Sequence, residues 1–105
     1  MLNITEVRFK KIGNGNFLGY AGVTISDSIA IREIKLFDSK NGKYIIMPGV
    51  KVNGLNKRRH FAFPVTEEAR KELLDAIVKK YEEELREEDE EKIGEAEENE
   101  EVVED

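Results

Sequence analysis

The stretch FLGYAGVTISDSIAIREIKLF, residues 17–37, contains two apolar runs separated by a short polar segment. Phe17–Ile25 and Ile29–Phe37 are long enough for strands and are bounded by turn-forming residues. Ser26-Asp27-Ser28, between the runs, has the composition of a turn. These residues therefore predict two consecutive strands at the centre of the fold.

The second run changes its alternation part-way along. Ile29 and Ile31 share one face of an extended strand, whereas Ile34 and Leu36 fall on the other face. A β-bulge would cause this slip, and so would a strand that buries one face against the core and the other against a second subunit. Both explanations are open from the sequence. We expect a homodimer through sheet edges or through Ile29–Phe37, because a small chain has a small core and two-fold symmetry is common.

Three further apolar segments surround this centre. Ile4–Ile12 alternates apolar and charged residues, and residues 13–16, GNGN, tolerate the positive φ angles of a tight turn into the next strand. Tyr44–Met47 and Phe61–Phe63 are short apolar runs, and each is followed by a proline. The sequence thus predicts a small antiparallel sheet of four to five strands.

A helix is predicted after these strands. Thr66 is a suitable N-cap, and Glu67 and Glu68 lie in the first turn, where the helix dipole favours negative charge. The apolar residues that follow recur at helical spacing: Leu73, Leu74, Ile77, Val78, Tyr81 and Leu85. They form a broad stripe that can cover one face of the sheet. The fold class is therefore α+β, with the sheet packed by a C-terminal α-helix.

The charge of the chain is divided unevenly. Residues 1–81 hold 15 Lys+Arg and 8 Asp+Glu, net +7, whereas residues 82–105 hold 2 and 15, net −13. We predict a basic domain over residues 1–85 and an acidic disordered tail over residues 86–105, because the tail has too little apolar surface to fold alone. A tethered tail of this charge can occupy a basic loop of the same chain, or it can simply keep the protein soluble.

Composition limits the classes of protein to which the chain can belong. The chain has 105 residues, enough for one domain, and it has no cysteine, which excludes disulfides and thiolate chemistry. The N-terminus has no signal-peptide pattern, and no run approaches the roughly 20 apolar residues that span a bilayer. We expect a cytoplasmic protein without membrane insertion and without a cofactor.

Cations gather between the last two predicted strands. Lys51, Lys57, Arg58 and Arg59 lie in this loop, and Arg70 and Lys71 follow in the first turns of the helix. Such side chains can reach along a phosphate backbone, although a solvated loop also favours charge. We take these six residues as the candidate nucleic-acid-binding site.

The sequence gives only weak support for a catalytic or metal-binding site. His60 is the only histidine and has no nucleophile at a recognisable spacing, so a surface or phosphate-contacting role is favoured over a base. Glu68, Glu72 and Asp75 lie at helical spacing and could gather a hard cation. Surface ion pairs with lysines four residues away explain such carboxylates better. We expect no enzyme activity and no metal site.

Several of these segments resemble a known family. The segments GKYIIMPG (42–49), KVNGLNKRRHFAFP (51–64) and TEEARKELLDAIVKKY (66–81) are similar to the SpoVG family, the stage V sporulation protein G or septation-protein family. The similarity covers residues 4–81. Its more specific part is the Met-Pro before a basic loop, followed by Ala-x-Pro before a helix.

The resemblance implies a small α+β domain, a homodimer, and a cytoplasmic regulator that binds DNA and RNA and influences septation and gene expression. Arg59 matches the loop arginine of the family and Arg70 its helix arginine. The chain departs from the family at His60, where an acidic residue is common, and at Phe63, where histidine is common. The leading alternative is an adaptor that contacts the division machinery through the sheet or the tail, without binding nucleic acid.

Overall fold

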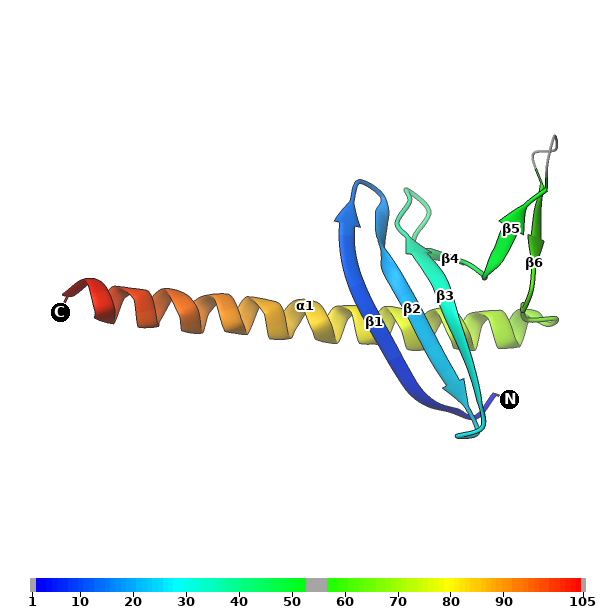
Figure 1. The fold of residues 1–105 in the computed structure, drawn as a ribbon, viewed down its shortest axis with the longest axis horizontal. Helices are drawn as coiled ribbons and strands as arrows, with labels where there is room; N and C mark the ends of the chain where they lie inside the picture. Colours follow the sequence, from blue (N-terminus) through cyan, green and yellow to red (C-terminus); the bar gives the residue numbers. More distant parts are fainter. Residues whose placement is uncertain (1, 53–56, 105) are drawn as a thin grey trace.

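An antiparallel sheet and one long helix form the structure, a computed structural model that describes residues 2–52 and 57–104 (Figure 1). Its elements are β1 (Ile4–Asn14), β2 (Phe17–Ile25), β3 (Ile29–Phe37), β4 (Tyr44–Ile46), β5 (Gly49–Lys51), β6 (Arg58–His60) and α1 (Glu67–Glu104). Strands β1 to β4 pair in sequence order, and β5 and β6 form a separate two-stranded ribbon. The predicted α+β class, with a small antiparallel sheet and a C-terminal helix, is confirmed.

Helix α1 crosses one face of the four-stranded sheet, and the β5–β6 ribbon stands near the beginning of the helix (Figure 1). The buried core between helix and sheet consists of Ala21, Val23, Ile34, Leu36, Ile45, Met47, Leu73 and Ile77. At the β1 edge the rings of Phe9 and Tyr81 meet edge to face, with centroids 5.3 Å apart. The predicted apolar stripe is therefore the surface by which the helix packs on the sheet.

The start of α1 follows its predicted capping. Thr66 Oγ1 accepts a hydrogen bond of 3.1 Å from the backbone N–H of Ala69, which is the bond that an N-cap threonine makes. Glu67 and Glu68 occupy the first turn, next to the positive end of the helix dipole. The chain therefore enters the helix at the position that the sequence indicates.

The change of alternation in β3 is a β-bulge. Ala21 of β2 pairs with Ile34, and Val23 pairs with Ile31, so two residues of β3 oppose one residue of β2. Glu33, within this bulge, has a φ of 61°. The extra residue returns Ile34 to the face that Ile31 already occupies. The bulge explanation is thus confirmed, and the buried part of β3 faces the helix on both sides of the slip.

The last short strand differs from its prediction. The expected strand at Phe61–Phe63 is wrong, because the structure has β6 at Arg58–His60 and bends directly after it. Its partner is β5 (Gly49–Lys51), and the ribbon is extended by a 2.9 Å bond from Val52 N to the Lys57 carbonyl. The position of this strand is decided by backbone pairing with β5. The apolar character of Phe61–Phe63, on which the prediction was based, does not decide it.

The backbone of α1 continues through Glu104, and the predicted disorder of the acidic tail over residues 86–105 stays a prediction. Glutamate, lysine and arginine have favourable helix propensity, and the turns packed on the sheet supply the nucleus that an isolated acidic segment lacks. The proposed boundary at residue 85 lies inside this helix and stays a prediction. No helix among the described residues combines the length and apolar character needed to cross a membrane.

Candidate nucleic-acid interface

The β5–β6 ribbon and the residue before β6 carry four of the six candidate cations on exposed positions. Lys51 of β5 lies directly opposite Arg58 of β6, and Arg59 lies opposite Val50. Lys57 precedes β6 and is also exposed. Like charges directly opposite each other destabilise a strand pair. Lys51 and Arg58 therefore do not stabilise the ribbon through their charges, which favours a role for them in binding. The predicted loop is thus a paired ribbon over Gly49–Lys51 and Arg58–His60, and residues 53–56 lie outside the described residues.

Close backbone contacts fix the base of the ribbon. A Cβ atom added to Gly49 would collide with the carbonyl oxygen of Arg59 and approach His60 Cα to 2.8 Å, so only glycine fits there. His60 Nδ1 lies 3.1 Å from the Met47 carbonyl oxygen. The guanidinium of Arg58 donates a 3.2 Å hydrogen bond to the Gly49 carbonyl. The Arg58–Gly49 bond joins the two strands of the ribbon, and the His60–Met47 contact connects the ribbon to the residue that follows β4.

A hollow of about 180 Å³ lies between β4, the ribbon and the first turn of α1. Arg58 reaches it from the ribbon and Arg70 from the helix. The other described residues that line it are Ile45, Ile46, Met47, His60 and Phe63. None of these lining residues carries a carboxylate. The hollow therefore combines two guanidinium groups with a largely apolar wall.

Its chemistry suits an anion with an attached flat or apolar group. A guanidinium offers a planar fork of donors that matches a phosphate, and it also stacks on flat rings. Phe63, one of the lining residues, exposes more than half of its surface. A nucleotide presents both a phosphate and a base, so this arrangement can contact both parts of it.

The six candidate residues do not converge on one point. The hollow brings Arg58 and Arg70 together, whereas Lys51, Lys57, Arg59 and Lys71 are exposed but do not line it. Sequence reasoning missed the walls contributed by Met47 and Phe63. The Met-Pro and Phe-x-Phe-Pro patterns next to the cations were the available signal for these walls.

The carboxylates considered as a cation site have another environment. Glu72 Oε2 accepts a 2.7 Å hydrogen bond from the backbone N–H of Leu2, which connects the helix to the beginning of the chain. Among the side chains that the structure describes, in residues 2–52 and 57–88, no group of three or more histidine or acidic residues is placed to hold a metal ion.

Comparison with known proteins identifies the domain that carries this site. The model of the SpoVG family matches residues 2–83. The chain belongs to the SpoVG family. The SpoVG protein of Finegoldia magna is 36% identical over 85 residues, which cover 80% of this chain and 78% of that protein. The SpoVG protein of Archaeoglobus fulgidus is 33% identical over 84 residues, covering 79% and 98%. The one from Treponema denticola is 32% identical over 82 residues, covering 77% and 87%.

These SpoVG relatives carry septation-protein names. The family match includes the whole sheet, the β5–β6 ribbon and the packed part of α1. It ends at residue 83, so most of the acidic segment follows the SpoVG match. The predicted family resemblance is confirmed.

Proposed function

We propose that this SpoVG-family chain is a cytoplasmic regulator that binds DNA or RNA without enzymatic turnover and thereby influences gene expression and septation. The observation that carries the proposal is the hollow that both Arg58 and Arg70 line, although they are 12 positions apart in the sequence. Lys51, Lys57 and Arg59 extend the positive surface along the ribbon. Each can contact a phosphate of a nucleic acid that lies over the hollow.

Net charge supports the same reading. Residues 1–81 carry a net charge of +7, so this part of the chain attracts polyanions. Phosphate contacts release counterions, and the affinity then falls steeply with salt concentration. A protein that bound through apolar contacts alone would lack this dependence.

The test is selection of bound sequences from random DNA and RNA pools, followed by titration of the selected sequences across a salt series. We expect binding whose logarithm falls linearly with the logarithm of the salt concentration. Absence of binding to either pool at low salt would reject the proposal. It would favour the adaptor alternative instead.

One observation supports that second candidate. Phe61, Phe63 and Val65 in the segment before α1 are exposed, and Val65 leaves 85% of its surface accessible. Adjacent exposed apolar side chains commonly mark protein contacts. As an adaptor of the division machinery, the chain would use this segment, and Val65→Ser would abolish partner binding without changing nucleic-acid affinity.

We further propose that the chain forms a homodimer through β3. Strand β4 pairs only with Lys35–Phe37, so among the described residues the other half of β3 has no neighbouring strand on that side. Ile29 in this half exposes 61% of its surface. An unpaired apolar strand segment can pair with its copy about a two-fold axis. Sedimentation at low micromolar concentration and moderate salt should show a dimer, and a monomer alone would refute the pairing.

A further inference from the structure

The face of the four-stranded sheet opposite to α1 carries a second pattern of cations and aromatic rings. Directly paired residues on neighbouring strands point to the same face. One such row runs from Lys10 to Tyr20, Lys35 and Ile46 across the four strands. Because Ala21 and its neighbours in the core point toward the helix, this row points away from it. The open face therefore presents a tyrosine between two lysines.

Aromatic rings continue this row toward β4. Phe17 contacts Tyr20 edge to face, with ring centroids 5.1 Å apart, and lies 5.1 Å from Phe37. Phe37 in turn stacks on Tyr44 at 5.5 Å, with an angle of 11° between the rings. Tyr20 is 37% exposed and Tyr44 is 45% exposed. Three strands thus hold a chain of four rings whose two tyrosine ends are accessible.

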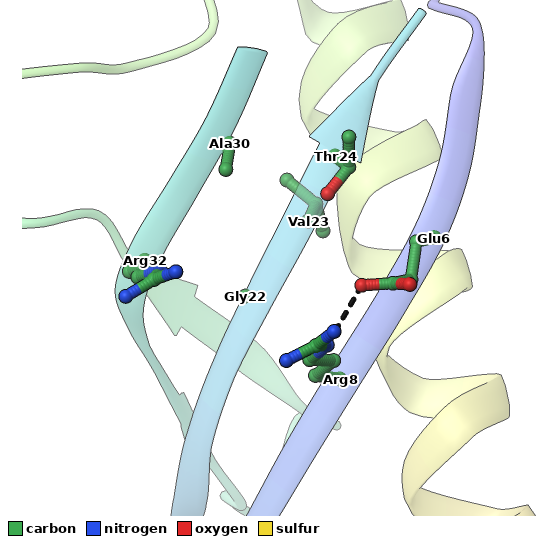
Figure 2. Close-up of a pocket in the computed structure, with 7 residues that line it drawn as sticks. All are labelled: Glu6, Arg8, Gly22, Val23, Thr24, Ala30 and Arg32. Carbon is green, nitrogen blue, oxygen red and sulfur yellow. Dashed lines mark hydrogen bonds and ion pairs between the residues drawn. The ribbon is translucent and has the colours of Figure 1, made fainter. Parts of the chain in front are cut away.

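The next row of the same face contains a hollow of about 190 Å³ at Gly22 (Figure 2). Arg8 of β1 and Arg32 of β3 lie on either side of this glycine (Figure 2). Glu6 Oε1 accepts a 2.7 Å hydrogen bond from Arg8 Nε, which orients that guanidinium along the hollow (Figure 2). Two arginines therefore border a shallow site at a strand position, Gly22, that has no side chain.

The local backbone does not require glycine at position 22. A Cβ atom there would lie 3.6 Å from the Ile31 carbonyl oxygen and 3.9 Å from Arg32 Cγ, which are ordinary contact distances. Gly22 is also not among the glycines with positive φ. Glycine inside a strand weakens it and often marks a bulge or the close approach of a ligand or of another backbone. Gly22 lies opposite the bulge of β3, and it also leaves the hollow between Arg8 and Arg32 open to a ligand.

We propose that the open face of the sheet binds single-stranded nucleic acid, with bases stacked on Tyr20 and Tyr44 and phosphates held by the flanking cations. The cations of the platform are Arg8, Lys10, Arg32 and Lys35. The proposal rests on the proposed nucleic-acid binding, but it assigns a different surface from the ribbon and a specific strand form.

Geometry selects the single strand over the duplex. Bases in a duplex are stacked on one another, so their faces cannot reach a ring on a flat sheet, whereas unpaired bases can be splayed onto aromatic side chains. Successive rows on one face of a strand are about 7 Å apart. The rows at Gly22 and Tyr20 can therefore accept neighbouring nucleotides of an extended strand.

The experiment compares the full chain and its variants on three ligands of equal length: poly-dT, poly-U and a mixed-sequence duplex. Tyr20→Leu and Tyr44→Leu should each weaken single-strand binding about ten-fold or more, because a stacked base is lost. Tyr20→Phe should retain the affinity, since it keeps the ring. Gly22→Val, which fills the hollow with a good strand former, should also weaken single-strand binding. None of these changes should alter duplex binding more than about two-fold.

A second measurement does not depend on the variants. The chain has three tyrosines and no tryptophan, so its intrinsic emission reports tyrosine. Poly-dT or poly-U should quench that emission in the parent chain and only weakly in the doubly substituted Tyr20→Leu/Tyr44→Leu chain, where Tyr81 remains.

Three outcomes are distinguishable. Selective loss of single-strand affinity with quenching in the parent supports the platform. Unchanged single-strand affinity in both tyrosine-to-leucine variants overturns the platform and leaves the proposed function standing. Failure of the parent chain to bind any of the three ligands at low salt overturns both. A preference between poly-dT and poly-U identifies DNA or RNA as the ligand.

Discussion

Removing the two guanidinium groups of the ribbon–helix hollow provides the sharpest test of the interface. Arg58 and Arg70 line the same hollow from separate elements, and both are exposed. The double variant Arg58→Ala/Arg70→Ala should fold, because neither side chain is part of the buried core. It should bind duplex DNA more weakly and with less dependence on salt.

The size of the effect follows from the number of cations removed. Each phosphate contact contributes about 0.9 to the slope of log affinity against log salt for duplex DNA. Loss of two contacts should therefore lower the slope by about 1.8. Between about 50 and about 200 mM salt, a four-fold change, the parent should then lose roughly 12-fold more affinity than the variant.

Fluorescence anisotropy with a labelled duplex across a salt series measures this slope. The matched control is Lys79→Ala/Arg86→Ala, which removes the same charge from exposed positions of α1 outside the hollow. Arg58→Lys/Arg70→Lys should keep most of the slope, because lysine still neutralises a phosphate. If the alanine pair and the control pair change the slope equally, only net charge matters and the hollow is not the interface.

Three further changes test the fold and the acidic segment. Ile77→Ala should lower the unfolding free energy by about 2–5 kcal/mol in urea titration, because this side chain is fully buried under the sheet; a smaller loss would mean that the helix packs loosely. Gly19→Ala should lower the stability by about 1–3 kcal/mol, since its Cβ would collide with the Lys10 carbonyl, while Gly22→Ala should be tolerated; equal melting temperatures for the two variants would contradict this. A chain that ends at Arg86 should bind nucleic acid more tightly at low salt and equally at physiological salt; equal affinity at every salt concentration would remove any role of the acidic segment in binding.

Local sequence patterns predicted most of the sheet. The bounds of β2 and β3 agree with the predicted runs Phe17–Ile25 and Ile29–Phe37, because turn-forming residues delimit both. The slip in β3 could not be assigned, since its cause is a positive φ at Glu33, a residue type that seldom adopts this conformation. Neither could Phe61–Phe63 be recognised as a bend, because ribbon pairing depends on contacts across the connection.

The sequence showed which cations could form the candidate site, but it did not show how the fold arranges them. The sequence suggested that the beginning of the helix adds charge near the ribbon, and Arg70 does line the hollow with Arg58. Lys71 does not, because consecutive residues of a helix point in different directions. The open face escaped sequence reasoning for a similar reason. Arg8 and Arg32 are 24 positions apart and become neighbours of one hollow only through the register of three strands.

The course of α1 bears on whether the acidic segment can occupy the ribbon of its own chain. The helix begins beside the ribbon and projects past the opposite edge of the sheet (Figure 1). At 1.5 Å per residue, residue 87 lies about 30 Å along the helix from its beginning. Screening lengths are about 8 Å at physiological salt and about 30 Å at 0.01 M, so only low salt allows the segment to influence the ribbon from that position. An acidic contact that the structure does show is local, with Glu88 Oε2 2.8 Å from Lys11 Nζ of β1. Contact with the ribbon stays a prediction, and within one chain it would require α1 to bend or unwind.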